Sequence, residues 1–241
     1  MTNTIVNTGN NALLECRNIT KNYGSKTALS NVNITIEKGR IIGLLGPNAS
    51  GKTTLIKLIM GLLTPTGGEI SVLGHPVGIE SKKVISYLPD RTYLDENMRV
   101  KDVIAYFEDF YEDFDPGRAY EMLRNLDISA KDKIKTLSKG TKEKVQLVMV
   151  MSRRAALYIL DEPIAGVDPA ARDYIIRTIL SNYEETASII ISTHIITDIE
   201  NILDDVIFLK EGQVNLTSTV EELREKEGKS IDSIFREVFR C

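Results

Sequence analysis

The residues with the clearest chemical potential form one short loop that leads into a helical pattern. The loop matches Gly, four residues, Gly-Lys and then Ser or Thr, and it consists of Gly46, Pro47, Asn48, Ala49, Ser50, Gly51, Lys52, Thr53 and Thr54. Glycines let successive backbone N–H groups converge on an anion, and the free N–H groups of the following helix add to that site. Lys52 could then reach terminal phosphates while the Thr53 hydroxyl ligates Mg²⁺. The loop therefore predicts a site for a nucleotide with Mg²⁺.

Two adjacent carboxylates, Asp161 and Glu162, supply a second set of chemical groups about 110 residues later. They directly follow the apolar run 157–160, which predicts a buried strand whose carboxyl end points at a ligand crevice. We expect Asp161 to hold Mg²⁺ through water and Glu162 to polarise a water for in-line attack on the γ-phosphate. The alternative is a surface turn with two solvated acids.

The sequence pattern around the loop and the two carboxylates predicts alternating strands and helices that would position them. The run 39–45 predicts a buried strand before the loop, and apolar residues at helical spacing follow it. Residues 13–20 and 32–36 favour an antiparallel pair, and further short strands are predicted at 69–74, 84–88, 157–160, 188–192 and 205–209. Such alternation predicts an α/β fold with a parallel sheet covered on both faces. Residues 91–154 are helical in pattern and predict an inserted lobe, and short helices are expected at 219–226 and 231–239.

The composition of the chain limits the classes of molecule that it could bind. The chain has 241 residues, 42% of them hydrophobic, and a net charge of −4, which argues against a nucleic-acid binder. Cys16 and Cys241 form no metal or disulfide framework, which suits a reducing cytoplasm. The first residues are unlike a signal peptide, and no apolar run approaches the roughly 20 residues that span a bilayer. Work at a membrane would therefore require another, membrane-spanning chain.

Several further motifs, in this order and spacing, resemble those of the ATP-binding cassette (ABC) ATPases over roughly residues 13–216. Tyr23 matches the aromatic residue that stacks on adenine in that family. The segment 137–141, Leu-Ser-Lys-Gly-Thr, takes the place of the family signature and contributes Ser138 and Gly140 to the nucleotide site. The loop 165–168, with Asp168, matches the one that crosses the dimer interface, and His194 matches the switch histidine that touches the γ-phosphate.

The resemblance implies a P-loop NTPase fold with a RecA-like core, an antiparallel β subdomain and an inserted helical subdomain. Its boundaries would be 13–218 for the ATPase domain, comprising a core of 13–90 and 155–218 and a helical subdomain of 91–154, followed by a short helical extension at 219–241. It also implies a dimer that sandwiches two ATP molecules, with the helix end at Ser138 serving the nucleotide of the other protomer. The second protomer could be an identical or a different chain.

Three positions depart from the family pattern. Asp90 stands where Gln is usual, Lys139 and Thr141 replace a Gly and a Gln in the signature, and Ala49 replaces a loop glycine. Asp90 can still ligate Mg²⁺ but adds a negative charge. Because Lys52, Asp161, Glu162 and His194 all remain, we expect ATP hydrolysis.

The favoured hypothesis is the ATP-hydrolysing subunit of a membrane exporter with a separate permease, held at the cytoplasmic face of the membrane through that permease. The signature variant and the segment 94–100 resemble drug, lantibiotic and peptide-toxin exporters of Gram-positive bacteria, among them those of phenol-soluble modulins. The alternatives are an importer subunit and a soluble ABC mechanoenzyme acting on ribosomes or DNA. A GTPase is disfavoured because no Asn-Lys-x-Asp motif occurs.

Overall fold

The structure is a computed structural model that describes residues 12–165, 169–184 and 186–239. Ten strands within these residues form two sheets. The smaller sheet is antiparallel, has the order β2-β1-β4-β5, and consists of β1 (Ala12–Tyr23), β2 (Lys26–Glu37), β4 (Gly67–Val72) and β5 (His75–Pro76). The first two strands form the antiparallel pair that the sequence predicts, joined by a turn at Gly24 and Ser25.

The larger sheet carries the residues with chemical potential. Its order is β10-β9-β3-β8-β7-β6, and its strands are β3 (Ile41–Leu45), β6 (Ile85–Leu88), β7 (Leu157–Asp161), β8 (Ser188–Thr193), β9 (Asp205–Lys210) and β10 (Gln213–Thr219). The five strands from β9 to β6 are parallel, and β10 pairs antiparallel with β9 at one edge. Every residue of β3, β7 and β8 is buried, as expected for strands covered on both faces.

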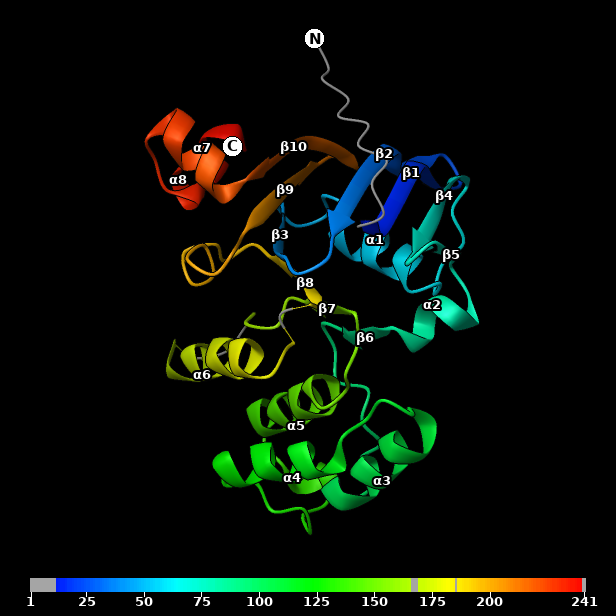
Figure 1. Cartoon of the computed structure of the whole chain (residues 1–241), viewed down its shortest axis with the longest axis vertical. Helices are drawn as coiled ribbons and strands as arrows, with labels where there is room; N and C mark the ends of the chain where they lie inside the picture. Colours follow the sequence, from blue (N-terminus) through cyan, green and yellow to red (C-terminus); the bar gives the residue numbers. More distant parts are fainter. Residues whose placement is uncertain (1–11, 166–168, 185, 240–241) are drawn as a thin grey trace.

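Helices cover the sheets and form a separate lobe. The helices are α1 (Lys52–Ile59), α2 (Ile79–Lys83), α3 (Val100–Phe110), α4 (Pro116–Asn125), α5 (Lys139–Met151), α6 (Pro169–Ser181), α7 (Val220–Glu227) and α8 (Ile231–Val238), with a 3₁₀ turn at Ile134–Thr136. Figure 1 shows α3, α4 and α5 gathered at one end of the molecule, far from the antiparallel sheet. Helices α7 and α8 lie beside β9 and β10, where Phe235 and Phe239 pack on Phe208.

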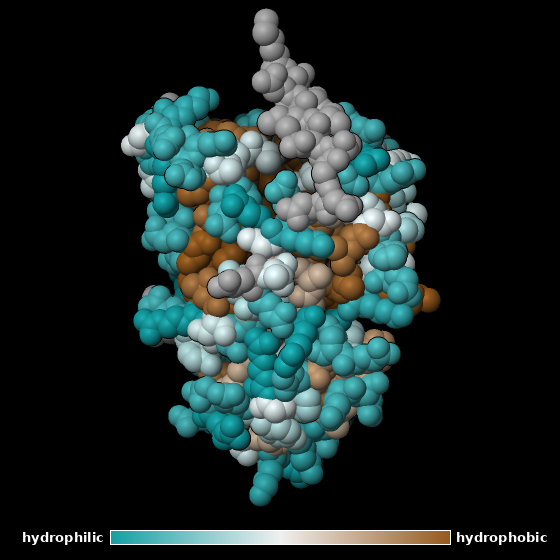
Figure 2. Space-filling view, viewed as in Figure 1, coloured by the Kyte–Doolittle hydropathy of each residue, from teal (hydrophilic) through white to brown (hydrophobic). Residues whose placement is uncertain are grey.

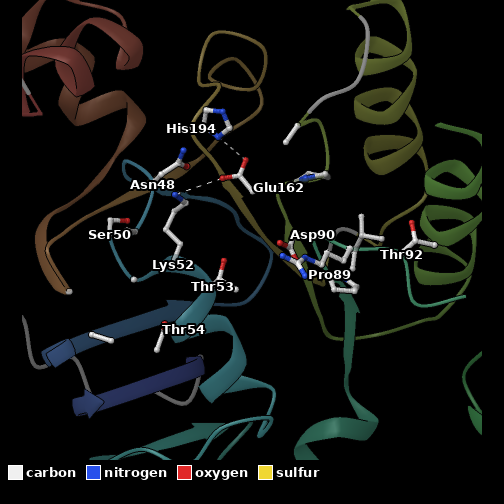
Figure 3. Close-up of a pocket in the computed structure, with 18 of the residues that line it drawn as sticks. Asn48, Ser50, Lys52, Thr53, Thr54, Pro89, Asp90, Thr92, Glu162 and His194 are labelled. Carbon is white, nitrogen blue, oxygen red and sulfur yellow. Dashed lines mark hydrogen bonds and ion pairs between the residues drawn. The ribbon is translucent and has the colours of Figure 1, made fainter. Parts of the chain in front are cut away.

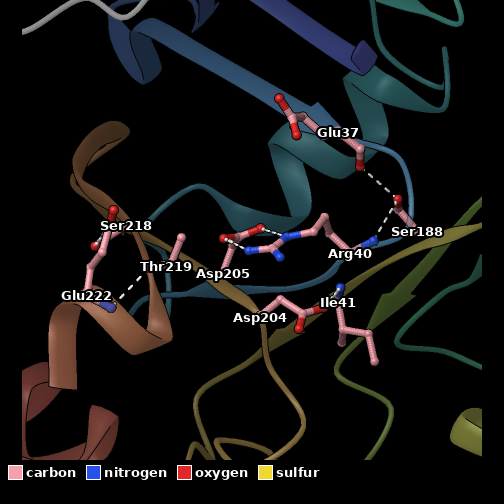
Figure 4. Close-up of polar contacts among 9 residues, drawn as sticks. All are labelled: Glu37, Arg40, Ile41, Ser188, Asp204, Asp205, Ser218, Thr219 and Glu222. Atoms are coloured by element: carbon pink, nitrogen blue, oxygen red, sulfur yellow. Dashed lines mark hydrogen bonds and ion pairs between the residues drawn. The ribbon is translucent and has the colours of Figure 1, made fainter. Parts of the chain in front are cut away.

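Polar contacts hold together the end of the larger sheet at which its parallel strands begin, opposite their carboxyl ends. Arg40 makes two hydrogen bonds of 2.8 Å with the carboxylate of Asp205, and Asp204 accepts a 2.8 Å bond from the backbone N–H of Ile41 (Figure 4). Ser188 donates to the backbone oxygen of Glu37 at 2.8 Å. These bonds join the start of β3 to the start of β9, and the start of β8 to the end of β2.

The structure also contains elements that the sequence does not predict. Strand β10 escapes prediction because five of its seven residues are polar and none is fully buried, and α2 because it has five residues. On the face drawn in Figure 2, hydrophilic side chains cover most of the helical lobe, and apolar ones reach the surface mainly beside the sheets. Among the described residues, no helix is both long and apolar enough to cross a membrane.

Candidate functional site

Four neighbouring strands of the larger sheet deliver their carboxyl ends to one cavity. The loop 46–51 follows β3, Glu162 follows β7, His194 follows β8, and Asp90 follows β6 by two residues. The cavity has a volume of about 990 Å³, and Figure 3 shows Lys52, Glu162 and His194 on one side of it with Asp90 and Thr92 on the other. Parallel strands thus bring together residues that are up to 146 positions apart in the chain, from Asn48 to His194.

Backbone conformation shapes the loop between β3 and α1. Gly51 caps α1 with φ of 112°, a conformation open to glycine, and a Cβ there would lie 2.8 Å from Leu29. A Cβ at Gly46 would meet the backbone oxygen of Leu209 at 2.4 Å. Ala49 adopts φ of 64°, so the alanine that replaces a customary glycine holds the left-handed conformation that glycine favours. The loop therefore keeps its shape at a cost in backbone strain.

Lys52 lies beneath the loop with only 6% of its side chain exposed. Its ammonium group donates to the backbone oxygens of Gly46 at 2.7 Å and Pro47 at 3.3 Å. Burial lowers the pKa of Lys52, and the nearby charges of Glu162 and Asp161 oppose that shift. The buried Ser50 hydroxyl has no hydrogen-bond partner among the described residues. A cation, an unpartnered hydroxyl and a helix N-terminus in one loop fit a phosphate group.

Glu162 connects two other members of the site. Its Oε1 lies 3.7 Å from the Lys52 ammonium, and its Oε2 lies 3.0 Å from Nδ1 of His194. Its own N–H donates to the backbone oxygen of Ser192 at 3.0 Å, and its φ is 53°. A non-glycine residue in this conformation is uncommon and is characteristic of functional sites. The carboxylate is thus directed into the cavity by the turn that ends β7.

Asp161 is buried at the end of β7, next to Glu162 in the chain. Its Oδ1 accepts a 2.5 Å hydrogen bond from the Ser192 hydroxyl, whereas its buried Oδ2 accepts none from the described residues. Burial raises the pKa of Asp161; Asp90 and Glu162 raise it further, while hydrogen bonds from Ser192 and the Thr53 hydroxyl lower it. A buried carboxylate oxygen without a donor, close to Thr53 and within the electrostatic influence of two other carboxylates, fits a hard cation such as Mg²⁺.

The remaining predicted residues fall into three groups. Those that line the cavity with the groups above are Tyr23, Asn48, Ala49, Ser50, Gly51, Thr53 and Thr54. Ser138 and Gly140 are exposed at the beginning of α5 and do not line this cavity, although Lys139 does. Ser138 caps that helix by accepting a 3.1 Å hydrogen bond from the N–H of Thr141. Asp168 lies outside the described residues.

Sequence reasoning missed the turn between β9 and β10. Gly212 donates to the backbone oxygen of Ser50 at 2.9 Å and accepts from the N–H of Ser30 at 2.9 Å. The turn therefore holds the loop 46–51 against the antiparallel sheet, and Glu211 and Gly212 line the cavity. A Glu-Gly pair between two short strands gives only a generic turn signal, so its contact with the loop could not be foreseen.

Known proteins resemble this chain in sequence. The family model for ABC transporters matches residues 29–165. The SkfA peptide export ATP-binding protein SkfE of Bacillus subtilis is 30% identical over 223 residues, which cover 89% of this chain and 92% of SkfE. The linearmycin resistance ATP-binding protein LnrL of the same organism is 30% identical over 219 residues, covering 88% of this chain and 70% of LnrL.

Solved structures show the same fold. An ATP-binding subunit of an ABC transporter superposes with a TM-score of 0.86 at 28% identity, covering 95% of this chain and all of the other. A dimeric ATP-binding cassette in a post-hydrolysis state, bound to ADP and Pi, superposes with a TM-score of 0.75 at 23% identity, covering 86% of this chain and 98% of the other. The second likeness shows the fold alone.

Proposed function

The chain belongs to the ABC transporter family of ATP-binding proteins, and we propose that it is the ATP-hydrolysing subunit of an exporter whose permease is a separate chain. The observation that carries the catalytic part of this proposal is the contact of Glu162 with both Lys52 and His194 in a cavity lined by the phosphate-type loop. An acid, a cation and an imidazole meet there at the ends of three different elements.

In the proposed site, the loop 46–51 and the N-terminus of α1 hold the phosphates of ATP, and Tyr23 stacks on the adenine. Lys52 exchanges its contacts with the oxygens of Gly46 and Pro47 for contacts with the terminal phosphates. The phosphate oxygens carry negative charge whereas the two carbonyl oxygens are neutral, so the attraction between opposite charges favours this exchange. The 48% exposed Tyr23 ring, at the rim of the same cavity, supports the position of the base.

Thr53, Asp161 and Asp90 would hold the Mg²⁺ ion. When bound, Mg²⁺ neutralises charge that develops on the phosphate oxygens. The unpartnered Oδ2 of Asp161 and the charge of Asp90 nearby support this set of residues. Ser192 donates to the other oxygen of Asp161, which fixes the orientation of the carboxylate.

Glu162 is the proposed general base. It accepts a proton from the attacking water, and His194 holds its carboxylate through Nδ1 while facing the terminal phosphate. The 3.0 Å contact between these side chains supports the pairing. General bases contribute roughly 10²–10⁴ in rate, so the loss of Glu162 should outweigh any other single change in this part of the site.

A second protomer would complete each site. Ser138 and Gly140 stand at the exposed N-terminus of the 13-residue helix α5, and we assign them to the nucleotide held by the partner protomer, together with Asp168. The positive end of a helix dipole is suited to a γ-phosphate. The partner could be a second copy or a related chain.

The export direction rests on the relatives, because SkfE is named for peptide export and LnrL for linearmycin resistance. A peptide, toxin or drug is therefore the proposed cargo, and the cytoplasmic face of the membrane the proposed location. The test is a pull-down of the tagged chain from detergent-solubilised native membranes, followed by mass spectrometry. A polytopic membrane protein in stoichiometric amount is expected, and a second ATPase would indicate a heterodimer. Recovery of ribosomal or other soluble partners alone would replace the exporter with a soluble mechanoenzyme.

A further inference from the structure

A buried glutamine on α5 binds the loop that carries Asp90. Gln146 is 3% exposed and its carboxamide meets the backbone of residues 89–93. Its Nε2 donates to the backbone oxygens of Pro89 and Arg91, each at 3.4 Å, and its Oε1 accepts from the N–H of Tyr93 at 3.2 Å. We propose that Gln146 is a positioning residue that holds the Asp90 carboxylate toward the metal side of the nucleotide site.

Within the part of the chain that the structure describes, no other side chain supports the backbone of this loop in the same way. Apart from the strand ladder of β6, the backbone hydrogen bonds described for residues 89–93 all go to Gln146. Asp90 lies between the two oxygens that Nε2 contacts, and its side chain is exposed to the cavity. Figure 3 shows Pro89, Asp90 and Thr92 following one another along the wall that faces Lys52. Without the carboxamide, the backbone that aims Asp90 would lose its anchor.

The same helix also holds the strand that precedes the loop. The Ser86 hydroxyl donates to the backbone oxygen of Val150 at 2.8 Å, and Arg153, just beyond α5, donates to the backbone oxygens of Ile85 and Lys83 at 2.5 Å each. Strand β6 and its loop are therefore attached to α5 along its second half. The loop of Asp90 is attached to α5 through Gln146, and Ser138 caps the N-terminus of the same helix. A shift of this helix would therefore move both residues together.

The carboxylate of Asp90 affects one neighbouring group in particular. Its charge reaches Asp161, the buried carboxylate at the end of the adjacent strand β7. Two carboxylates at the ends of adjacent strands repel each other unless a cation lies between them. The position of Asp90 should therefore govern the affinity of the site for Mg²⁺. The loop 46–51, on the far side of the cavity, should be unaffected. This inference rests on the proposed ATPase function.

The test replaces Gln146 in the full-length chain and measures the Mg²⁺ concentration for half-maximal phosphate release. Gln146→Met keeps the length and loses all three hydrogen bonds, and Gln146→Glu keeps only the acceptor for Tyr93. We expect Gln146→Met to raise the half-maximal Mg²⁺ concentration at least threefold, with Gln146→Glu changing it in the same direction. Affinity for a fluorescent ADP analogue in EDTA should stay within twofold. Peptides covering 89–93 should exchange their amide hydrogens faster in both variants.

Two controls separate positioning from general damage. Glu96→Gln removes a 2.6 Å ion pair between Lys142 of α5 and an exposed acid that follows the loop 89–93, and should leave the Mg²⁺ dependence unchanged. In an Asp90→Ala background, Gln146→Met should add no further shift, because the two residues act through one carboxylate. An unchanged Mg²⁺ dependence in an active Gln146→Met protein, or an equal shift without Asp90, would overturn the inference while the ATPase stands. A wild-type chain that releases no phosphate would overturn both.

Discussion

The ammonium group of Lys52 lies 3.7 Å from the carboxylate of Glu162, although the two residues are 110 positions apart. The pair is largely shielded from solvent, with side chains 6% and 16% exposed. The group assigned to phosphate binding and the group assigned to water activation therefore contact each other directly.

Lys52→Ala should weaken nucleotide binding. Loss of a charged hydrogen-bond donor to a phosphate corresponds to about 1.5–3 kcal/mol, or roughly a 10- to 150-fold lower affinity. Equilibrium titration with a fluorescent ATP analogue measures the effect. Lys57→Ala, on the exposed side of the same helix, is the matched control and should bind normally. Equal affinities for the two variants would remove Lys52 from the phosphate site.

Tyr23→Ala should also reduce affinity, but through the base. Stacking of an aromatic side chain on a base is worth roughly 1–3 kcal/mol. Tyr23→Phe keeps the ring and should bind within about twofold of wild type, since only the hydroxyl is lost. The same titration distinguishes the two variants. If Phe and Ala weakened binding alike, the ring would not be the adenine contact.

Ala49→Gly should stabilise the fold, because Ala49 holds φ of 64°. Relief of left-handed strain is worth about 1–2 kcal/mol and outweighs the extra unfolded-state entropy of glycine, leaving a net gain of about 0.5–1 kcal/mol. Urea unfolding gives the value. Ala105→Gly, in the middle of α3, should instead destabilise by a similar amount. Destabilisation by both changes would show that Ala49 is unstrained.

Asp113→Ala should destabilise the helical lobe. Asp113 accepts two hydrogen bonds, of 2.9 and 3.1 Å, from Arg153, whose guanidinium is 3% exposed and lies 3.9 Å from the ring of Tyr111. Breaking a buried pair costs 3–5 kcal/mol, and because Asp113 is 26% exposed we expect about 2–3 kcal/mol. Urea unfolding again gives the cost, with the exposed Asp109→Ala as a control. A loss below about 0.5 kcal/mol, typical of surface changes, would contradict the buried pairing.

Prediction from sequence succeeded where the signal is local. The loop before Lys52 and the strand before Asp161 each carry glycine or apolar patterns within ten residues, and the structure places both as expected. The fold class and the family are confirmed. The assigned roles of the site residues and the domain boundaries stay predictions.

What the sequence could not supply are contacts between distant segments. Gln146 is one more polar residue in a helical pattern until α5 packs against the loop of Asp90. The turn at Gly212 is an ordinary turn until it meets Ser50. Strand β10 alternates polar and apolar residues only over 213–217, and its two apolar residues, Val214 and Leu216, are too few to mark a strand by themselves. Such roles arise from tertiary packing and leave no local pattern.

The most direct test of the whole account is phosphate release by Glu162→Gln in the presence of Mg²⁺ and ATP. We expect at least a 100-fold loss of turnover, in line with the contribution of about 10²–10⁴ from a general base, with ATP binding retained. Glu121→Gln, an exposed acid on α4, should turn over like wild type. Normal turnover by Glu162→Gln would contradict the account, because the carboxylate that contacts Lys52 and His194 would then have no part in hydrolysis.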